Sequence, residues 1–450
     1  MTRKTRKTLF FLAIAAFVAL GFFVIMYAQG YRWDFNKHRL LLSGAIYVEP
    51  LAPEKTDISI NPAFAGKGGV NGKITDSQTT ASLIKNLLPF RTYQITVAAD
   101  GYQTWAKELS VEPGLVVEAK NTVLFPQKLN GQIILVNKNL TDFAVSPNQN
   151  YIALNTSNKI TLDNLADIQN SAPLVFADKI KTNAVGFLKN GQGWSDDSKK
   201  FIFWRAVAPY GFQTGRVAWY IWDSATNKII ELNSLYERKI VLKNASSSPL
   251  PTKFNPTKVK WLGQDLLALI NGRVLRLDIT NQTVTDLNLS DIVDFDYQNS
   301  KIIALKKPNI LLLMDSAVQN VSAVGNINIP AQKVLFSPEG DKVLFASNNT
   351  VGVIWLKETS KQPSHKTGDK EIIYPALAGQ SGVGDTYWHK FGENIIILDN
   401  NQLKAVELDE RGERNIAAWS DTISAINYFP ENQKLFLLSN GELKQTENKF

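Results

Sequence analysis

The stretch Lys333-Val-Leu-Phe-Ser-Pro-Glu-Gly-Asp-Lys-Val-Leu-Phe345 decides the fold of most of this chain. Two apolar runs, Val334–Phe336 and Val343–Phe345, flank the turn residues Ser337-Pro-Glu-Gly340. Valine and phenylalanine favour strands, and proline and glycine between them favour a tight turn. The stretch therefore predicts a β-hairpin.

The same order of apolar strand, polar turn and hydrophobic strand recurs along the chain. The repeats are about 35 to 65 residues apart, which brackets the ~40–50 residues of a four-stranded propeller blade. Third strands follow, as in Val217–Trp222 and Val351–Trp355. We expect a mainly β chain with a seven-bladed β-propeller over residues 129–450; a large two-sheet sandwich is the alternative. The seven hairpins start at Asp142, Gly193, Val259, Val293, Lys333, Asp385 and Ala425.

The last repeat and the segment before the first one are each incomplete. No fourth strand follows Gly441-Glu-Leu-Lys444, while residues 131–136 (Gly-Gln-Ile-Ile-Leu-Val) form a strand with no hairpin of its own. Placing this strand in the last blade removes two open sheet edges at once. We therefore predict that residues 131–136 close the propeller.

Three of the turns carry a resemblance to a known family. Ser146-Pro-Asn-Gln149, Ser195-Asp-Asp-Ser198 and Ser337-Pro-Glu-Gly340 are similar to the Ser-Pro-Asp-Gly-type turn of TolB-like and WD40-like propellers. The resemblance implies a propeller fold and no particular chemistry, since such residues fix a tight hairpin turn.

Residues 44–126 predict a small antiparallel β-sandwich. Tyr93, Ile95 and Val97 alternate with polar residues, and the turn Asp100-Gly101 leads to a strand that begins at Trp105. The segment resembles the PEGA-domain family of bacterial envelope modules. The resemblance rests on residues 53–61, 72–75, 87–97 and 100–102 together with Trp105.

The N-terminal residues predict a signal-anchor that crosses a membrane once. Residues 9–28 contain no charge and no proline, and twenty helical residues rise about 30 Å, the thickness of the hydrocarbon core. The positive-inside rule keeps the basic tail, residues 1–8, in the cytoplasm. A cleaved signal peptide is the alternative; Met26-Tyr27-Ala28 is a poor cleavage site. The expected interfacial residues are Arg3, Lys4, Arg6 and Lys7 inside, and Tyr27, Tyr31 and Trp33 outside.

This topology places a juxtamembrane segment, residues 29–43, and both β domains outside the cytoplasmic membrane of a bacterium. It also changes how the net charge of +8 is interpreted, because four of those charges lie in residues 1–8. The remaining positive charge is spread along the chain, whereas nucleic-acid binding calls for a basic cluster on a folded domain. We expect no nucleic-acid partner.

The chain has no cysteine, so disulfides and thiolate metal sites are excluded.

Catalytic motifs are missing from the sequence. The three histidines, His38, His365 and His389, form no His-Glu-x-x-His pair, and Gly379-Gln-Ser-Gly-Val383 fails as a nucleophile elbow at its last position. Asp196-Asp197 lies in a turn, where such residues cap backbone amides. Asp291, Asp294 and Asp296 lack the spacing of a calcium loop. We expect no enzyme activity, no cofactor and no metal.

The long insertion in the second repeat is the candidate ligand site. It runs from Arg205 to Arg216 and carries Tyr210 and Phe212 in a turn-rich, apolar context. Long loops on one face of a propeller are common binding elements. The sequence thus favours a non-catalytic envelope protein whose propeller binds a protein or a cell-wall polysaccharide. The alternatives are a propeller hydrolase acting on surface glycans and an envelope sensor with a separate signalling partner.

Overall fold

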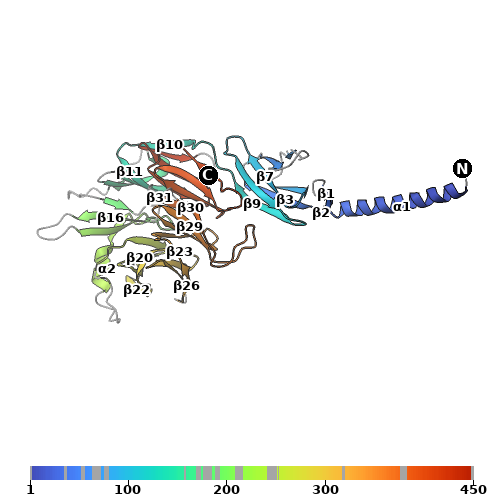
Figure 1. Cartoon of the computed structure of the whole chain (residues 1–450). Coiled ribbons are helices and arrows are strands. Elements are labelled where there is room, and N and C mark those ends of the chain that lie inside the picture. Colours follow the sequence, from blue (N-terminus) through green and yellow to red (C-terminus); the bar gives the residue numbers. More distant parts are fainter. Residues whose placement is uncertain are drawn as a thin grey trace. The chain divides into compact units, whose positions relative to one another are not determined.

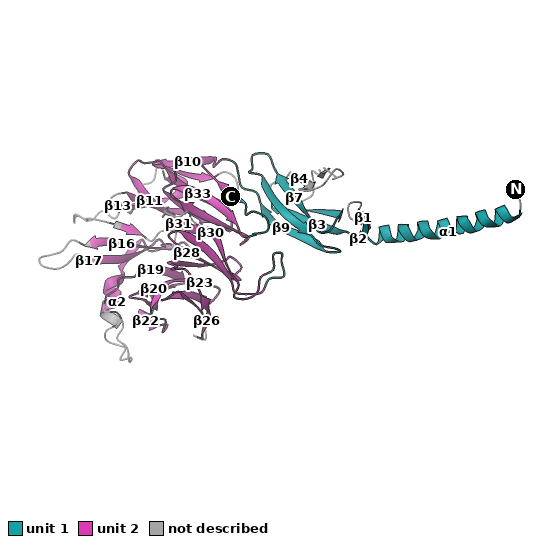
Figure 2. Ribbon diagram, in the orientation of Figure 1, with its two compact units in different colours: residues 1–127, 359–364, 409–415 teal, residues 128–358, 365–408, 416–450 magenta. Residues whose placement is uncertain are grey.

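The computed structural model describes residues 3–34, 38–51, 56–62, 72–74, 81–156, 159–168, 174–175, 185–187, 193–207, 216–240, 251, 253–316, 320–375 and 383–446 (Figure 1). The chain divides into two compact units, coloured separately in Figure 2. Unit 1 contains residues 1–127, 359–364 and 409–415, and unit 2 contains residues 128–358, 365–408 and 416–450.

Helix α1 (Arg3–Ala28) is long and apolar enough to cross a membrane, and none of its residues is buried in the protein. A signal sequence near an N-terminus meets the same description. The helix begins at Arg3 rather than at the first apolar residue, Leu9. Arginine and lysine are good helix formers, so the basic residues extend the helix instead of ending it.

The segment after the helix is a hairpin, which the sequence analysis did not predict. Strand β1 (Tyr31–Asp34) pairs antiparallel with β2 (Arg39–Leu42). The Arg32 guanidinium lies 3.7 Å from the ring centroid of Tyr27 and donates to the Tyr27 carbonyl oxygen at 2.8 Å. This contact joins the hairpin to the last turn of α1.

Unit 1 also contains two sheets that share one hydrophobic core. Alternate residues of β7, namely Tyr93, Ile95 and Val97, are buried, as the period of two predicts. The three-stranded sheet has the order β6 (Ser82–Leu87), β3 (Gly44–Leu51), β9 (Val116–Val123), and the four-stranded sheet has the order β5 (Gly72–Ile74), β4 (Asp57–Pro62), β7 (Arg91–Ala98), β8 (Trp105–Val111).

Side-chain amides cap the edge strands β8 and β9 within unit 1. The Asn415 side chain accepts a hydrogen bond from the Ala106 amide at 3.1 Å and donates one to the Ala106 carbonyl oxygen at 3.0 Å. The Gln362 side chain does the same on β9, donating to the Val116 oxygen at 3.1 Å and accepting from the Glu118 amide at 3.0 Å. Each amide takes the place of a neighbouring strand, so these edge groups are satisfied.

The described residues of unit 2 form seven four-stranded antiparallel sheets, sheets 1 to 7 in chain order. Sheet 1 has β11 (Leu140–Val145), β12 (Tyr151–Thr156), β13 (Lys159–Asn164) and β14 (Leu174–Val175). Sheet 2 has β15 (Val185–Phe187), β16 (Lys200–Val207), β17 (Arg216–Asp223) and β18 (Lys228–Glu231). Sheet 3 has β19 (Lys258–Leu262), β20 (Asp265–Ile270), β21 (Arg273–Asp278) and β22 (Thr283–Asp286). Sheet 4 has β23 (Ile292–Gln298), β24 (Lys301–Lys306), β25 (Ile310–Asp315) and β26 (Val321–Asn326).

The remaining three sheets follow the same meander. Sheet 5 has β27 (Lys333–Phe336), β28 (Lys342–Ser347), β29 (Thr350–Trp355) and β30 (Lys370–Pro375). Sheet 6 has β31 (Val383–Trp388), β32 (Asn394–Asp399), β33 (Gln402–Glu407) and β34 (Ile416–Ala418). Sheet 7 has β35 (Ala425–Phe429), β36 (Lys434–Ser439), β37 (Glu442–Thr446) and β10 (Gly131–Val136). The 3-10 turn η1 (Leu165–Asp167) follows β13, and helix α2 (Leu232–Ile240) follows β18.

Sheet 7 combines both ends of unit 2. Strand β10 lies before sheet 1 in the chain but pairs antiparallel with β37, with Gln132 opposite Gln445. This is the pairing that the sequence analysis expects for residues 131–136. It gives the last sheet its fourth strand.

The first strand of sheet 2 differs from the expected hairpin start at Gly193. Strand β15 pairs with the far half of β16, where Phe187 lies opposite Phe203. Trp194 makes a separate bridge to Phe201 on the same strand. Two separated segments therefore occupy the position that one continuous strand fills in sheet 1.

The turn serines have the structural role that the sequence predicts. The Ser337 hydroxyl donates to Asp341 at 2.7 Å and accepts from the Lys342 amide at 3.0 Å, and its side chain is fully buried. Ser195 repeats the arrangement with Asp197. The serines thus fix the start of the second strand in each hairpin.

Several tryptophans of the repeats pack between neighbouring sheets. Trp194 and Trp222 lie in the core between sheets 1 and 2, and Trp219 and Trp261 in the core between sheets 2 and 3. Burial of aromatic side chains on this scale is a main source of stability in a chain without disulfides.

Candidate functional site

Side-chain hydrogen bonds link each sheet of unit 2 to the next one and link sheet 7 back to sheet 1. They come from the first strand of each sheet or the turn beside it, so the connection closes on itself. Sheets 1 and 2 are linked by Trp194 Nε1 to Ala144 O at 2.9 Å, and sheets 2 and 3 by Trp261 Nε1 to Gly193 O at 3.2 Å. Sheets 3 and 4 are linked by the ion pair of Lys258 with Asp294 at 2.8 Å, and sheets 4 and 5 by Val334 N to Asp294 at 2.8 Å. Sheets 5 and 6 are linked by Trp388 Nε1 to Leu335 O at 3.2 Å, sheets 6 and 7 by Tyr387 OH to Ile426 O at 3.0 Å, and sheets 7 and 1 by Val145 N to Asn427 at 3.0 Å.

Two buried carboxylates hold sheets 3, 4 and 5 together. Asp294 forms an ion pair with Lys258, and Asp296 forms one with Lys260. The same carboxylates also accept backbone amide hydrogen bonds from strand β27, at 2.8 Å each. Both carboxylates thus bind groups of the protein itself. The described residues contain no group of three histidine, cysteine or acidic side chains able to hold a metal ion.

Lys333 lies beside this cluster on β27. Its ammonium donates to the Thr386 carbonyl oxygen of sheet 6 at 3.2 Å. Burial lowers the pKa of Lys333 to about 8, and the carboxylates of Asp385, Asp294 and Asp296 oppose this shift. A positive charge at this position therefore carries a desolvation cost.

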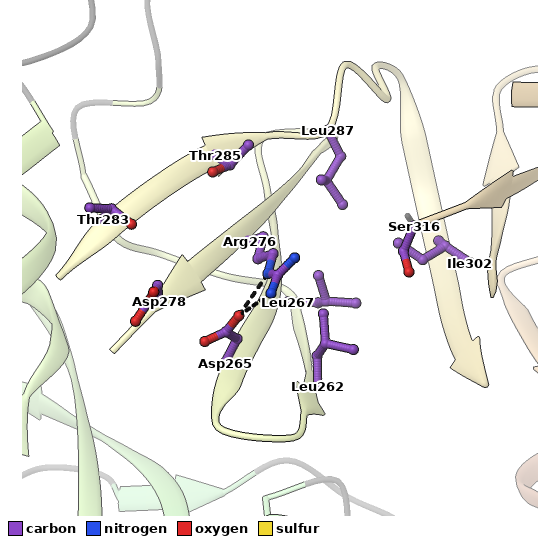
Figure 3. Close-up of a pocket in the computed structure, with 10 residues that line it drawn as sticks. All are labelled: Leu262, Asp265, Leu267, Arg276, Asp278, Thr283, Thr285, Leu287, Ile302 and Ser316. Carbon is purple, nitrogen blue, oxygen red and sulfur yellow. Dashed lines mark hydrogen bonds and ion pairs between the residues drawn. The ribbon is translucent and has the colours of Figure 1, made fainter. Parts of the chain in front are cut away.

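A cavity of about 250 Å³ opens between sheets 3 and 4, and Figure 3 shows its lining. The apolar part of the lining is Leu262, Leu267, Leu287 and Ile302, and the polar part is Asp265, Arg276, Asp278, Thr283, Thr285 and Ser316. Most of these residues come from sheet 3; Ile302 lies on β24 and Ser316 just after β25. The pocket lies wholly within unit 2.

The register of sheet 3 explains how one face carries this lining. Leu267 lies opposite Arg276, and Arg276 lies opposite Thr285, so the three side chains form a row. One step outward, Asp278 lies opposite Thr283, and the next register position brings Asp265 opposite Asp278. Leu267 therefore gives the first row its apolar part, and the second row is wholly polar.

The two aspartates of the pocket have different partners. Arg276 donates to Asp265 from Nε at 2.7 Å and from Nη2 at 2.6 Å, drawn as dashed lines in Figure 3. Asp278 accepts from the backbone and side-chain amides of Asn281, both at 2.8 Å. These hydrogen bonds lower the pKa of Asp278, so its carboxylate stays ionised at neutral pH.

The sequence-predicted ligand residues are only partly within the described chain. Arg205 lies on β16, where its Nε donates to the Tyr220 hydroxyl at 2.9 Å and its guanidinium lies 5.0 Å from the Tyr220 ring centroid. Arg216 begins β17, and its backbone pairs opposite Val207. The tip residues Tyr210 and Phe212 lie outside the described residues.

The predicted interfacial residues fall on two elements. Arg3, Lys4, Arg6 and Lys7 lie in the first turns of α1, and Tyr27 lies in its last turn with 64% of its surface exposed. Tyr31 and Trp33 lie on β1, where Trp33 is 46% exposed.

Side chains considered for catalysis at the sequence level are engaged in structural contacts. His389 is fully buried, stacked on Tyr428 with ring centroids 6.2 Å apart. His365 stacks on Trp355 at 3.7 Å. Asp197 accepts from the Lys199 amide and the Ser195 hydroxyl, as expected of an aspartate that caps a turn.

No protein-family model matches the chain, and no curated protein matches it. Among solved structures, it is similar to PorZ, an essential surface component of the type-IX secretion system of Porphyromonas gingivalis, with 11% identity and a TM-score of 0.43; the match covers 70% of this chain and 37% of that chain. It is similar to a chain of the mitotic checkpoint complex (12% identity, TM-score 0.44, covering 72% of this chain and 91% of that one).

A third similar structure is the β-propeller domain of Cps50 (Swd1) from Myceliophteria thermophila, with 12% identity and a TM-score of 0.45, covering 70% of this chain and 98% of that domain. At these identities and TM-scores the likeness carries no argument about function.

Proposed function

We propose that this protein is a single-span, membrane-anchored binding protein that displays a seven-bladed β-propeller and has no catalytic activity of its own. The pocket between sheets 3 and 4 is its ligand site. The observation that carries the proposal is the combination of a ring of sheets joined at every step with an open pocket, lined by both apolar and polar side chains, on that ring.

The ring supports a role as a rigid scaffold. Each of the seven sheets is bonded to the next by a side chain whose partner is a backbone group or an opposite charge. Sites built on strands hold their side chains more rigidly than sites on loops. The pocket residues Leu267 and Arg276 lie on such strands.

The proposed membrane topology and order of domains are those expected from the sequence. Residues 1–8 form a cytoplasmic tail, residues 9–28 span the cytoplasmic membrane of a bacterium, and residues 29–43 lead to a PEGA-like sandwich over residues 44–126. Residues 129–450 form a TolB-like propeller outside the membrane. The apolar, exposed surface of α1 supports the anchor, because such a surface needs an apolar surrounding.

Cysteine labelling tests this topology, since the chain has no cysteine of its own. Thr8→Cys places a thiol before the span, and Glu358→Cys places one on an exposed site of unit 2. A membrane-impermeant maleimide applied to intact cells with a permeable outer layer should label only the second. Labelling of Thr8→Cys in intact cells contradicts the orientation. A mature protein that lacks residues 1–28 by mass spectrometry would establish the signal peptide instead.

An activity assay tests the absence of catalysis. The full-length protein in nanodiscs should leave chitin oligosaccharides, cell-wall fragments and unstructured peptides intact over a day at neutral pH. Turnover that follows the protein through purification contradicts the proposal and favours the hydrolase alternative.

A further inference from the structure

We propose that the pocket between sheets 3 and 4 receives the lysine or arginine side chain of a partner protein. This inference rests on the proposed binding function and adds the chemical class of the ligand.

The size of the pocket matches one long side chain. Its volume, about 250 Å³, is below the ~300–1,000 Å³ of pockets that enclose drug-sized molecules. A ligand that enters it is therefore small, or is one extended group of a larger partner that stays outside.

The order of the lining matches a chain with an apolar stem and a polar head. Leucines 262, 267 and 287 and Ile302 supply an apolar floor beside the core that sheets 3 and 4 share. Asp265, Asp278 and Thr283 lie together at the polar end of the same face. Lysine and arginine lay their methylenes along apolar surface and keep the charged head among polar groups. No aromatic ring is present in the lining to stack against a sugar.

The charge of the lining selects a cation. Arg276 neutralises Asp265 through two short contacts, so the charge of Asp278 remains. Asp278 accepts hydrogen bonds from amides of its own turn, and each carboxylate oxygen can accept more than one donor. A bound ammonium or guanidinium group would add a charge-assisted hydrogen bond to the Asp278 carboxylate.

The test uses the full-length protein in nanodiscs of zwitterionic lipid. The probe is the peptide acetyl-Gly-Ser-Lys-Ser-Gly amide with a neutral fluorophore, and its twin has norleucine in place of lysine. Binding is followed by fluorescence anisotropy. We expect the norleucine peptide to bind at least tenfold more weakly, a loss of about 1.4 kcal/mol or more, because it cannot form the charge-assisted hydrogen bond.

Two variants should shift the affinity in opposite directions. Asp278→Asn keeps a hydrogen-bond acceptor for the Asn281 turn but removes the charge, and should weaken lysine-peptide binding about tenfold. Arg276→Gln frees the Asp265 carboxylate and should strengthen it severalfold. Asp421→Asn, at an exposed aspartate outside the pocket, is the matched control and should leave the affinity unchanged.

Equal binding of the two peptides, or the same response of both variants, overturns the inference. Binding of a chitin oligosaccharide that Asp278→Asn does not weaken also overturns it, while leaving the proposed binding function intact. Cleavage of either probe contradicts the proposed function itself.

Discussion

The carboxylate of Asp294 accepts a 2.8 Å hydrogen bond from the backbone amide of Val334, which lies on the next sheet along the chain. The same carboxylate pairs with Lys258 of the preceding sheet at 2.8 Å, and both side chains are less than a tenth exposed. One side chain thus holds three successive sheets. We expect Asp294→Ala to lower the free energy of unfolding by about 3–5 kcal/mol, because it leaves a buried ammonium without its counter-ion.

Urea unfolding of the full-length protein, followed by tryptophan fluorescence, measures this loss. The matched control is Glu442→Ala, which breaks a half-exposed pair with Lys444 and should cost at most about 1 kcal/mol. Equal effects of the two substitutions would show that Asp294 holds no more than a surface contact.

A disulfide across the pair Gln132 and Gln445 should stabilise unit 2. These residues lie opposite each other on β10 and β37, so the bond closes a loop that contains nearly the whole unit. A loop of more than 100 residues corresponds to up to about 4–5 kcal/mol in the chain-entropy treatment. We expect the double cysteine variant to melt at a higher temperature, and dithiothreitol to reverse the gain. The single variant Gln132→Cys should show no response to dithiothreitol; a double variant that forms no bond under oxidation contradicts the strand pairing.

The free energy of unfolding of unit 2 should increase as the pH rises above neutrality, because of the lowered pKa of one lysine. The pKa of Lys333 is about 8 in the folded protein, against an ordinary value of 10.5. Between these values the unfolded chain binds a proton that the folded protein does not, so the free energy of unfolding increases with pH over that window. The cost of the buried charge is fully present below about pH 8. We expect Lys333→Met to change the free energy of unfolding more favourably at pH 7 than at pH 10.

Urea titrations at pH 7, 9 and 10 measure this dependence as the difference between variant and parent. Lys301→Met, at an exposed lysine on β24, supplies the background from other groups. A difference for Lys333→Met that stays flat with pH argues against a buried ammonium.

The amide cap of β8 should protect unit 1 from self-association. Asn415→Ala removes both hydrogen bonds to Ala106 and should cost about 1–3 kcal/mol. It also exposes an edge strand, and exposed edges pair with other chains. We expect light scattering of the detergent-solubilised protein to increase with concentration for this variant, and not for Asn320→Ala at an exposed asparagine. Unchanged scattering together with unchanged stability contradicts a capping role.

Apart from the first strand of sheet 2, the hairpins of unit 2 were predictable because their turns can be recognised in the sequence. Ser337-Pro-Glu-Gly340 lies between two apolar runs, and both strands are found where the pattern predicts them. The sequence pattern that indicates a strand is weaker elsewhere in the chain. Strand β6 was not predicted, since Ile84 is its only buried residue and its sequence therefore lacks clear alternation. The hairpin β1–β2 was missed because the segment after an anchor has no such pattern either.

The pocket was not predictable from motifs, because its lining is assembled by register. Asp265 and Asp278 lie far enough apart in the chain to form no recognisable spacing, and they meet only because β20 and β21 are antiparallel. The alternation of residues along β20 does indicate part of the lining, because Asp265, Leu267 and Leu269 share one face of this strand. The polar end of an otherwise apolar face marks where the core opens to solvent.

Strand β10 also determines when this protein can finish folding. It is synthesised before all seven hairpins of unit 2, yet its partner β37 comes roughly 300 residues later. At about 5–20 residues per second, a ribosome needs some 15 to 60 seconds to deliver that partner. For that interval both ends of the growing array keep an open strand edge, and a chain that stops early never closes it. Closure of sheet 7 thus requires that synthesis has passed β37.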